Sequence, residues 1–167
     1  MRENLKKSYK FALIVLTLGL IITGCSSNPP GKESVEKHFQ ENYNDIQTVV
    51  EFMCNSEYDS IHINTADGTM WADFEDGVVI EEKSVRDAIG RLLGASSIRQ
   101  YYYVYKSGNT IDFLQWKGIA EISSGVAYSI NGTDLPYIDY PTVLEPMSEP
   151  GWYYYVDDYN TWRSEHS

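Results

Sequence analysis

Residues 60–80 read SIHINTADGTMWADFEDGVVI, two alternating runs on either side of an Asp67-Gly68 pair. An Asp-Gly pair between alternating runs is a strong signal for a two-residue hairpin turn. It predicts strands at residues 60–65 and 69–74, with apolar side chains on one face. The predicted partners are Ile61 with Phe74, Ile63 with Ala72, and Thr65 with Met70. A second turn is predicted at Asp76-Gly77.

The other face of this predicted hairpin places His62 opposite Asp73. A carboxylate beside an imidazole orients the ring and favours its charged form, as in many general acid–base pairs. His62 and Asp73 are therefore the candidate acid–base pair of the chain. The alternative is an ordinary cross-strand pair on a solvated face.

Two helices are predicted on either side of the hairpin. Residues 33–54 carry one apolar stripe at helical spacing. The stripe consists of Val35, Phe39, Tyr43, Ile46, Val50 and Met53. Cys54 is next to Met53, so we expect a buried, unreactive thiol. The second helix is predicted to begin at Ser84 and to end at Gly94.

Further strands are predicted in the second half of the chain. They cover residues 98–106, 110–122, 126–130 and 152–157. Four prolines within residues 133–151 are expected to exclude regular structure, which predicts a long loop that is either a functional lid or disordered. The tail from residue 160 is polar, and we expect it to fray.

This order of elements predicts one α+β domain over residues 33–159, followed by a polar tail at residues 160–167. Short connections favour a mainly antiparallel sheet of five to seven strands, with a long N-terminal helix and a second, shorter helix. The order of elements over residues 33–130 resembles that of PAS-like and profilin-like sensor domains. That resemblance rests on element order alone, with no sequence motif behind it.

Aromatic side chains are the strongest compositional signal, with 14 Tyr and 4 Trp in the chain. Tyrosine presents a rigid apolar ring with a polar tip, which suits recognition surfaces. Alternation along the predicted strands places several aromatic side chains on one face, which is a candidate binding face for a sugar or peptide. The alternative is that tyrosine is simply a good strand former. The candidate face consists of Tyr101, Tyr103, Tyr105, Trp116, Tyr153 and Tyr155.

Motifs for known catalytic and cofactor sites are missing from the sequence. It contains no Gly-x-Ser-x-Gly elbow, no His-Glu-x-x-His, no P-loop and no Gly-x-Gly-x-x-Gly. The acidic residues 73–77 do not fit the spacing of an EF-hand calcium loop. We therefore assign no catalytic residue from a motif, and we expect no cofactor and no metal site.

The first 24 residues have the form of a secretory signal. Basic residues precede a 12-residue apolar run at residues 11–22, which is short for a bilayer-spanning helix. Ile22-Thr23-Gly24-Cys25 resembles the lipobox of bacterial lipoproteins. The resemblance implies a diacylglyceryl group on the Cys25 thiol, cleavage before Cys25, a tether at residues 25–32, and a lipid-anchored location on the outer side of a membrane.

The charge of the chain narrows the choice of partners. The formal net charge is −11, and removal of residues 1–24, which carry four cations and one Glu, gives −14. Such a domain repels phosphate, so we expect no nucleic-acid partner, and it attracts cationic ones. The leading hypothesis is a non-catalytic module that binds a peptide, a glycan or a protein. The alternatives are an envelope-acting hydrolase, which uses His62 with Asp73 or a carboxylate pair, and a self-protection lipoprotein that binds a cationic toxin.

Overall fold

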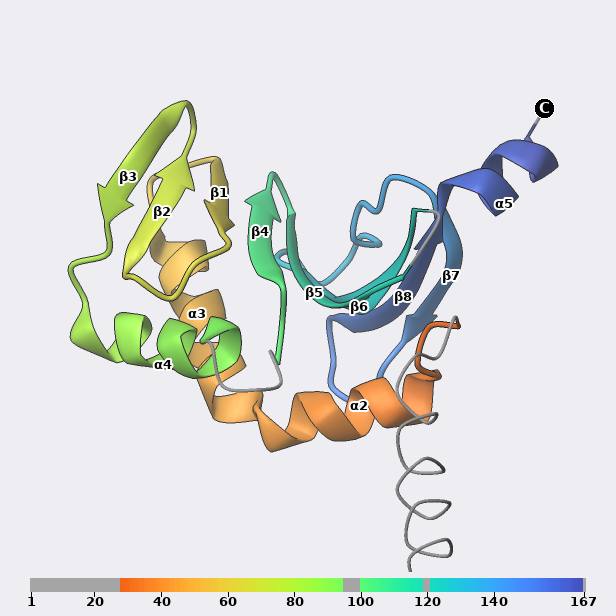
Figure 1. The fold of residues 1–167 in the computed structure, drawn as a ribbon, viewed down its shortest axis with the longest axis horizontal. Coiled ribbons are helices and arrows are strands. Elements are labelled where there is room, and N and C mark those ends of the chain that lie inside the picture. Colours follow the sequence, from red (N-terminus) through yellow and green to blue (C-terminus); the bar gives the residue numbers. More distant parts are fainter. Residues whose placement is uncertain (1–27, 95–99, 119–120, 167) are drawn as a thin grey trace, which may run out of the picture.

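The chain folds around a single eight-stranded sheet in the order β3-β2-β1-β4-β5-β6-β8-β7, with every neighbouring pair antiparallel. The computed structural model describes residues 28–94, 100–118 and 121–166. The predicted α+β class with a mainly antiparallel sheet is confirmed, with one strand more than the upper prediction (Figure 1). The helices are α2 (Lys32–Glu41), α3 (Tyr43–Asn55), α4 (Lys83–Leu93) and α5 (Tyr159–Glu165). The strands are β1 (Ser60–Ile63), β2 (Thr69–Ala72), β3 (Glu75–Val79), β4 (Tyr103–Ser107), β5 (Thr110–Lys117), β6 (Ile122–Ser129), β7 (Pro141–Pro146) and β8 (Trp152–Asp158).

The long N-terminal helix predicted for residues 33–54 is two helices, α2 and α3. Asn42 separates them with a non-helical backbone (φ −111°, ψ 8°). Its side-chain nitrogen donates to the carbonyl of His38, which satisfies an acceptor at the end of α2. The apolar stripe continues across the break, because residues of both helices are buried in the core. Cys54, which was predicted to be buried, is exposed.

The hairpin register differs from the prediction by two residues. Ile61 lies opposite Ala72 instead of Phe74, and His62 lies opposite Trp71. The connection is wider than a two-residue turn because the Asp67 carboxylate accepts bonds from the hydroxyl of Thr65 and from the backbone and hydroxyl of Thr69. A shift of two leaves the side chains that stay within β1 and β2 on their predicted faces, since the side-chain period of a strand is two. Ile61, Ile63, Met70 and Ala72 are accordingly buried, whereas Phe74 is not.

The second turn lies at Asp73-Phe74, not at Asp76-Gly77. Ala72 pairs with Glu75 across it, and Asp73 takes a positive φ of 41°. The Asp73 carboxylate accepts from the backbone N–H and the hydroxyl of Ser60, which fastens the turn to the start of β1. Phe74 at the tip is 96% exposed.

The proline-rich segment contains β7, although residues 133–151 were predicted to lack regular structure. β7 lies at the edge of the sheet and pairs only with β8. Pro141 and Pro146 are its first and last residues, positions where a strand tolerates proline because no central ladder bond is lost. Residues 130–140 remain as the connection between β6 and β7.

The tail predicted to be frayed from residue 160 is helix α5. The side chain of Asp158 accepts bonds from the backbone and hydroxyl of Thr161 at the first turn. A side-chain acceptor at this position satisfies a free N–H group and stabilises the helix by roughly 1 kcal/mol. The predicted PAS-like or profilin-like order stays a prediction.

The two faces of the sheet are covered differently. Helices α2, α3 and α4 lie on one side, and the connection of residues 130–140 lies on the other (Figure 1). The main core fills the helix side. There Lys106 is buried, and its ammonium group donates to the carbonyl of Met53 in the last turn of α3 and to that of Tyr58 after the helix. On the opposite side, Leu114, Ala127 and Tyr155 form a small second cluster.

The beginning of α2 is fastened to the last two strands. The hydroxyl of Tyr154 donates to the carbonyl of Pro30 at 2.9 Å. Lys32 forms an ion pair with Glu145 at 3.5 Å, and the Glu36 carboxylate accepts from the backbone of Ser148. These contacts fix the N-terminal end of the described chain beside β7 and β8. None of the described helices has the length and apolar character to cross a bilayer.

Candidate functional site

The predicted acid–base pair does not form. The Asp73 carboxylate accepts hydrogen bonds from Ser60 in the turn, whereas His62 lies in β1 opposite Trp71. The imidazole meets the rings of Tyr103 and Tyr105 edge-on, with centroid distances of 5.3 and 5.8 Å. Burial lowers the pKa of His62, so the ring is neutral near pH 7. His62 is therefore part of an aromatic surface, without a carboxylate partner from Asp73.

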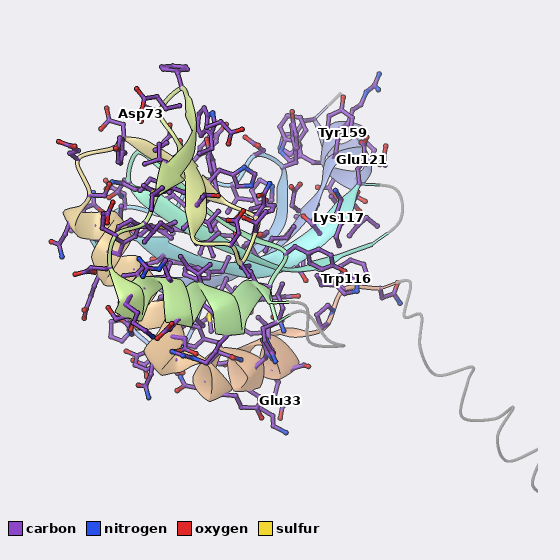
Figure 2. The ribbon with its side chains drawn as sticks, turned by 60° about the vertical axis from the view of Figure 1, so that its left-hand side comes forward. Glu33, Asp73, Trp116, Lys117, Glu121 and Tyr159 are labelled. Atoms are coloured by element: carbon purple, nitrogen blue, oxygen red, sulfur yellow. The ribbon has the colours of Figure 1, made fainter. Side chains whose placement is uncertain are left out.

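The predicted aromatic face is divided between the two sides of the sheet. Tyr101 precedes β4 and is fully buried on the helix side, where its ring packs against His38 and Phe113. Trp116 pairs with Ser124 of β6 beyond a bulge in β5. The β4–β5 pairing has the predicted register but ends at Tyr103 and Leu114, before Tyr101 and Trp116. Figure 2 shows Trp116 far from the turn that carries Asp73. The prediction is therefore wrong for Tyr101, and Trp116 does not line a cavity with the other predicted residues.

The other four residues of the predicted face lie on the helix-free side. Tyr103 and Tyr105 alternate with the buried Val104 and Lys106 along β4. Tyr153 and Tyr155 alternate with core residues along β8. Tyr103, Tyr105 and Tyr155 line a common cavity, and Tyr153 lies outside it.

This cavity, which we call the tyrosine–aspartate cavity, has a volume of about 210 Å³. Strands β4, β5, β6 and β8 form its floor, and the connection of residues 130–140 contributes a wall. A hydrogen bond from the backbone of Tyr137 to the hydroxyl of Thr110, 2.8 Å long, holds this connection against β5. The lining residues are Tyr103, Tyr105, Ser107, Thr110, Asp112, Ser123, Tyr137, Ile138, Asp139, Tyr155 and Asp157.

Asp112 lies in the floor of the cavity. It lies on β5, between Tyr105 of β4 and Ala127 of β6. The residue keeps some exposed surface, but its carboxyl group is enclosed. The hydroxyls of Tyr155 and Tyr103 donate to this carboxyl group, whereas its Oδ1 atom is buried and has no hydrogen-bond partner.

The environment of Asp112 makes it a weak acid. Burial raises its pKa to about 7, although the hydrogen bonds from the two tyrosines act in the opposite direction and lower the pKa. Burial also raises the pKa of Tyr155 and Tyr103 well above the ordinary value. Both phenols therefore stay protonated and serve as hydrogen-bond donors at neutral pH.

Two further carboxyl groups line the cavity. Asp157 on β8 is half-buried, and its Oδ1 atom has no partner. Burial raises its pKa to about 6, with a smaller contribution from repulsion by Asp139 and Asp158. Asp139 lies in the wall and accepts from the hydroxyl of Tyr137. The cavity thus concentrates acidic groups that repel one another.

Motifs and aromatic spacing do not point to these three acidic residues. Asp112 stands in the run TIDFLQWK, between Ile111 and Phe113 of a predicted strand. A carboxylate within an otherwise apolar strand is costly to bury and is therefore a usable signal for a functional site. Asp139 and Asp157 had no such signal, because Asp139 falls in the predicted loop and Asp157 is the last residue of a predicted strand, next to Asp158.

A wider hollow lies between α3 and the strands β2 and β3, with a volume of about 710 Å³. Its lining includes Phe52, Met70 and Val79. Among the described residues, none of the buried side-chain atoms without a partner belongs to this hollow. The tyrosine–aspartate cavity contains two of them, which makes it the stronger candidate site.

Metal binding has little support in the part of the chain that the structure describes. No three His, Cys, Asp or Glu side chains there are arranged to hold a metal ion. Comparison with known proteins gives no match among family models, curated proteins or solved structures.

Proposed function

We propose that this chain is a lipid-anchored extracytoplasmic lipoprotein whose domain is a non-catalytic binding module. The observation that carries the binding site is the Oδ1 atom of Asp112, a buried atom without a partner in a residue that lines the cavity. More than nine in ten buried polar groups in proteins are hydrogen-bonded, and an unsatisfied one costs about 1–3 kcal/mol. A ligand that bonds to Oδ1 would recover part of that cost, so the unpaired atom supports binding at this position.

The anchor rests on Ile22-Thr23-Gly24-Cys25, which lies outside the described residues. We expect cells that express the full chain to incorporate a labelled fatty acid into it. Cys25→Ala should abolish the label and release the protein from the membrane fraction. Cys54→Ala is the matched control, because it removes the other cysteine and should leave the label unchanged. Equal labelling of the wild type and Cys25→Ala would exclude the anchor.

The binding site is tested with the purified full-length chain in detergent. We expect a subset of envelope-derived peptides, glycans and amines to raise its melting temperature, because a ligand that binds only the folded state stabilises that state. Asp112→Asn and Tyr155→Phe should remove this rise, whereas Asp59→Asn, an exposed carboxylate outside the cavity, should retain it. A rise that persists in both cavity variants would place the site elsewhere.

A second candidate function is an envelope-acting hydrolase. The supporting observation is that Asp112 and Asp157 line one cavity with pKa values of about 7 and about 6. Two carboxyl groups with different raised pKa values suit a general acid and its partner in glycoside hydrolysis. The test is release of soluble fragments from labelled cell-wall glycan. Release by the wild type that Asp112→Asn and Asp157→Asn both abolish would establish the hydrolase.

A further inference from the structure

We infer that the tyrosine–aspartate cavity is a receptor for one organic cation, an ammonium or guanidinium head group, which takes the place of a proton among the cavity carboxylates. This inference rests on the proposed binding function and names the chemistry of its ligand. The head group belongs either to a small amine or to a Lys or Arg side chain of a protein. Its recognition chemistry is the same in both cases.

The charge of the lining is the first argument. Asp112, Asp139 and Asp157 all line the cavity, and no Lys, Arg or His is among the lining residues. Repulsion from Asp157 and Asp139 acts on Asp112, and repulsion from Asp139 acts on Asp157. A cation relieves this repulsion, whereas an anionic ligand increases it. A charge-assisted hydrogen bond from the cation to Oδ1 of Asp112 would also be stronger than one from a neutral donor.

The aromatic lining is the second argument. Tyr103, Tyr105, Tyr137 and Tyr155 line the cavity together with the carboxyl groups. The phenols of Tyr103 and Tyr155 donate to Asp112 and remain neutral, because burial raises their pKa values. Neutral aromatic rings attract cations through their electron-rich faces, the interaction that recognises ammonium groups in aromatic cages. Tyrosines beside carboxylates thus supply both parts of an organic-cation site.

The size of the cavity is the third argument. A volume of about 210 Å³ is below the roughly 300–1,000 Å³ typical of sites for drug-sized ligands. It suits a single head group better than a whole oligosaccharide. Within the described residues, the acidic side chains do not converge as the ligands of a metal ion would. The geometry therefore favours an organic cation over a metal cation.

Proton coupling follows from the same groups. Asp112 faces Tyr103 and Tyr105 of β4, Tyr155 and Asp157 of β8, and Asp139 of the wall, none of which carries positive charge. With a pKa of about 7, Asp112 must release a proton before it can pair with a cation. Affinity should therefore fall about tenfold for each pH unit well below 7.

The experiment is isothermal titration of the full-length chain in detergent at pH 5, 6, 7 and 8. The probes are agmatine, cadaverine, a lysine- and arginine-containing peptide, neutral N-acetylglucosamine and calcium chloride. We expect the amines or the peptide to bind most tightly at pH 8 and more weakly toward pH 5, where binding should release a proton. Asp112→Asn should reduce their affinity at pH 8 at least tenfold, and Asp157→Asn should reduce it less. Asp59→Asn is the matched control and should bind as the wild type does.

The outcomes separate this inference from the binding function on which it rests. Binding by the peptide alone identifies a protein as the source of the head group, and binding by the amines identifies a small molecule. If N-acetylglucosamine or calcium binds and neither the amines nor the peptide do, the inference is overturned while the binding function stands. If no ligand of any class, including the envelope-derived set, gives a binding isotherm or raises the melting temperature, the binding function itself fails. Cation binding that is equal at pH 5 and pH 8, or unchanged in both cavity variants of a folded protein, also overturns the inference.

Discussion

At the scale of single residues, Asp112 links the stability of the fold to pH. Its pKa of about 7 in the folded chain lies above its ordinary value of 3.8, so the folded state holds a proton that the unfolded state releases. The stabilising contribution is complete below about pH 4 and is lost as the pH rises through 7. At pH 8 the buried charge costs on the order of 4 kcal/mol.

We therefore expect Asp112→Asn to raise the free energy of unfolding at pH 8 and to change it little near pH 4. Asparagine has the same shape, accepts hydrogen bonds from the two tyrosines and carries no charge to bury. Urea denaturation at the two pH values measures the difference. Asp59→Asn should give no such pH-dependent gain. An equal effect of Asp112→Asn at both pH values would contradict a raised pKa at this position.

Residue patterns located some of the site and missed its centre. Alternation placed Tyr103 and Tyr105 on one face of β4, and both line the cavity. Tyr101 was assigned to the same face because it continues the alternation, but it precedes the strand and turns into the helix-side core. Asp112 was not predicted, because a single acidic residue does not indicate a site until its burial and its tyrosine neighbours are known.

At the scale of elements, β6 depends on a glycine at its centre. Gly125 pairs with Leu114 of β5 and with Tyr155 of β8. A Cβ atom at this position would collide with the carbonyl oxygen of Phe113 and lie 2.9 Å from the hydroxyl of Tyr155. The first contact is with backbone, which has little freedom to move in the middle of a sheet.

Gly125→Ala should therefore destabilise the fold by about 1–3 kcal/mol, as overpacking of a well-packed interior does. It should also displace the Tyr155 hydroxyl from Asp112 and weaken any ligand of the cavity. Gly90→Ala is the control, because Gly90 lies inside α4 with no atom near a new Cβ. That substitution should stabilise the helix by roughly 0.5–1 kcal/mol. Thermal denaturation of both variants measures the difference. Equal changes in melting temperature for Gly125→Ala and Gly90→Ala would refute this account of Gly125.

The types of most elements were predictable, and their connections were less so. The buried face of the hairpin was predicted because Ile61, Ile63 and Met70 repeat at intervals of two across the strands. The register was wrong because the bonds of Asp67 widen the loop, and turn signals do not encode such side-chain bonds. β7 was missed because prolines argue against a strand until its place at the sheet edge is known.

At the scale of the whole molecule, the excess of negative charge acts on both stability and binding. The chain carries a formal net charge of −11, and self-repulsion of that charge disfavours the compact state. Raising the salt concentration from about 0.01 M to 0.1 M shortens the screening length from about 30 Å to 10 Å. We expect the melting temperature to rise over this interval and the affinity for agmatine to fall. A melting temperature that falls with salt would contradict net self-repulsion, and N-acetylglucosamine serves as the neutral control for binding.

The contacts that fasten the start of α2 also limit how far the domain can stand from a membrane. Tyr154 bonds to Pro30, and Lys32 pairs with Glu145, so the chain has little freedom after this point. Only four residues lie between Cys25 and Pro30, and the five residue-to-residue steps from one to the other span at most about 18 Å. With lipid on Cys25, as proposed, this short tether would keep the β7–β8 edge close to the bilayer surface. The cavity on the helix-free face would then meet only ligands that diffuse to the membrane surface.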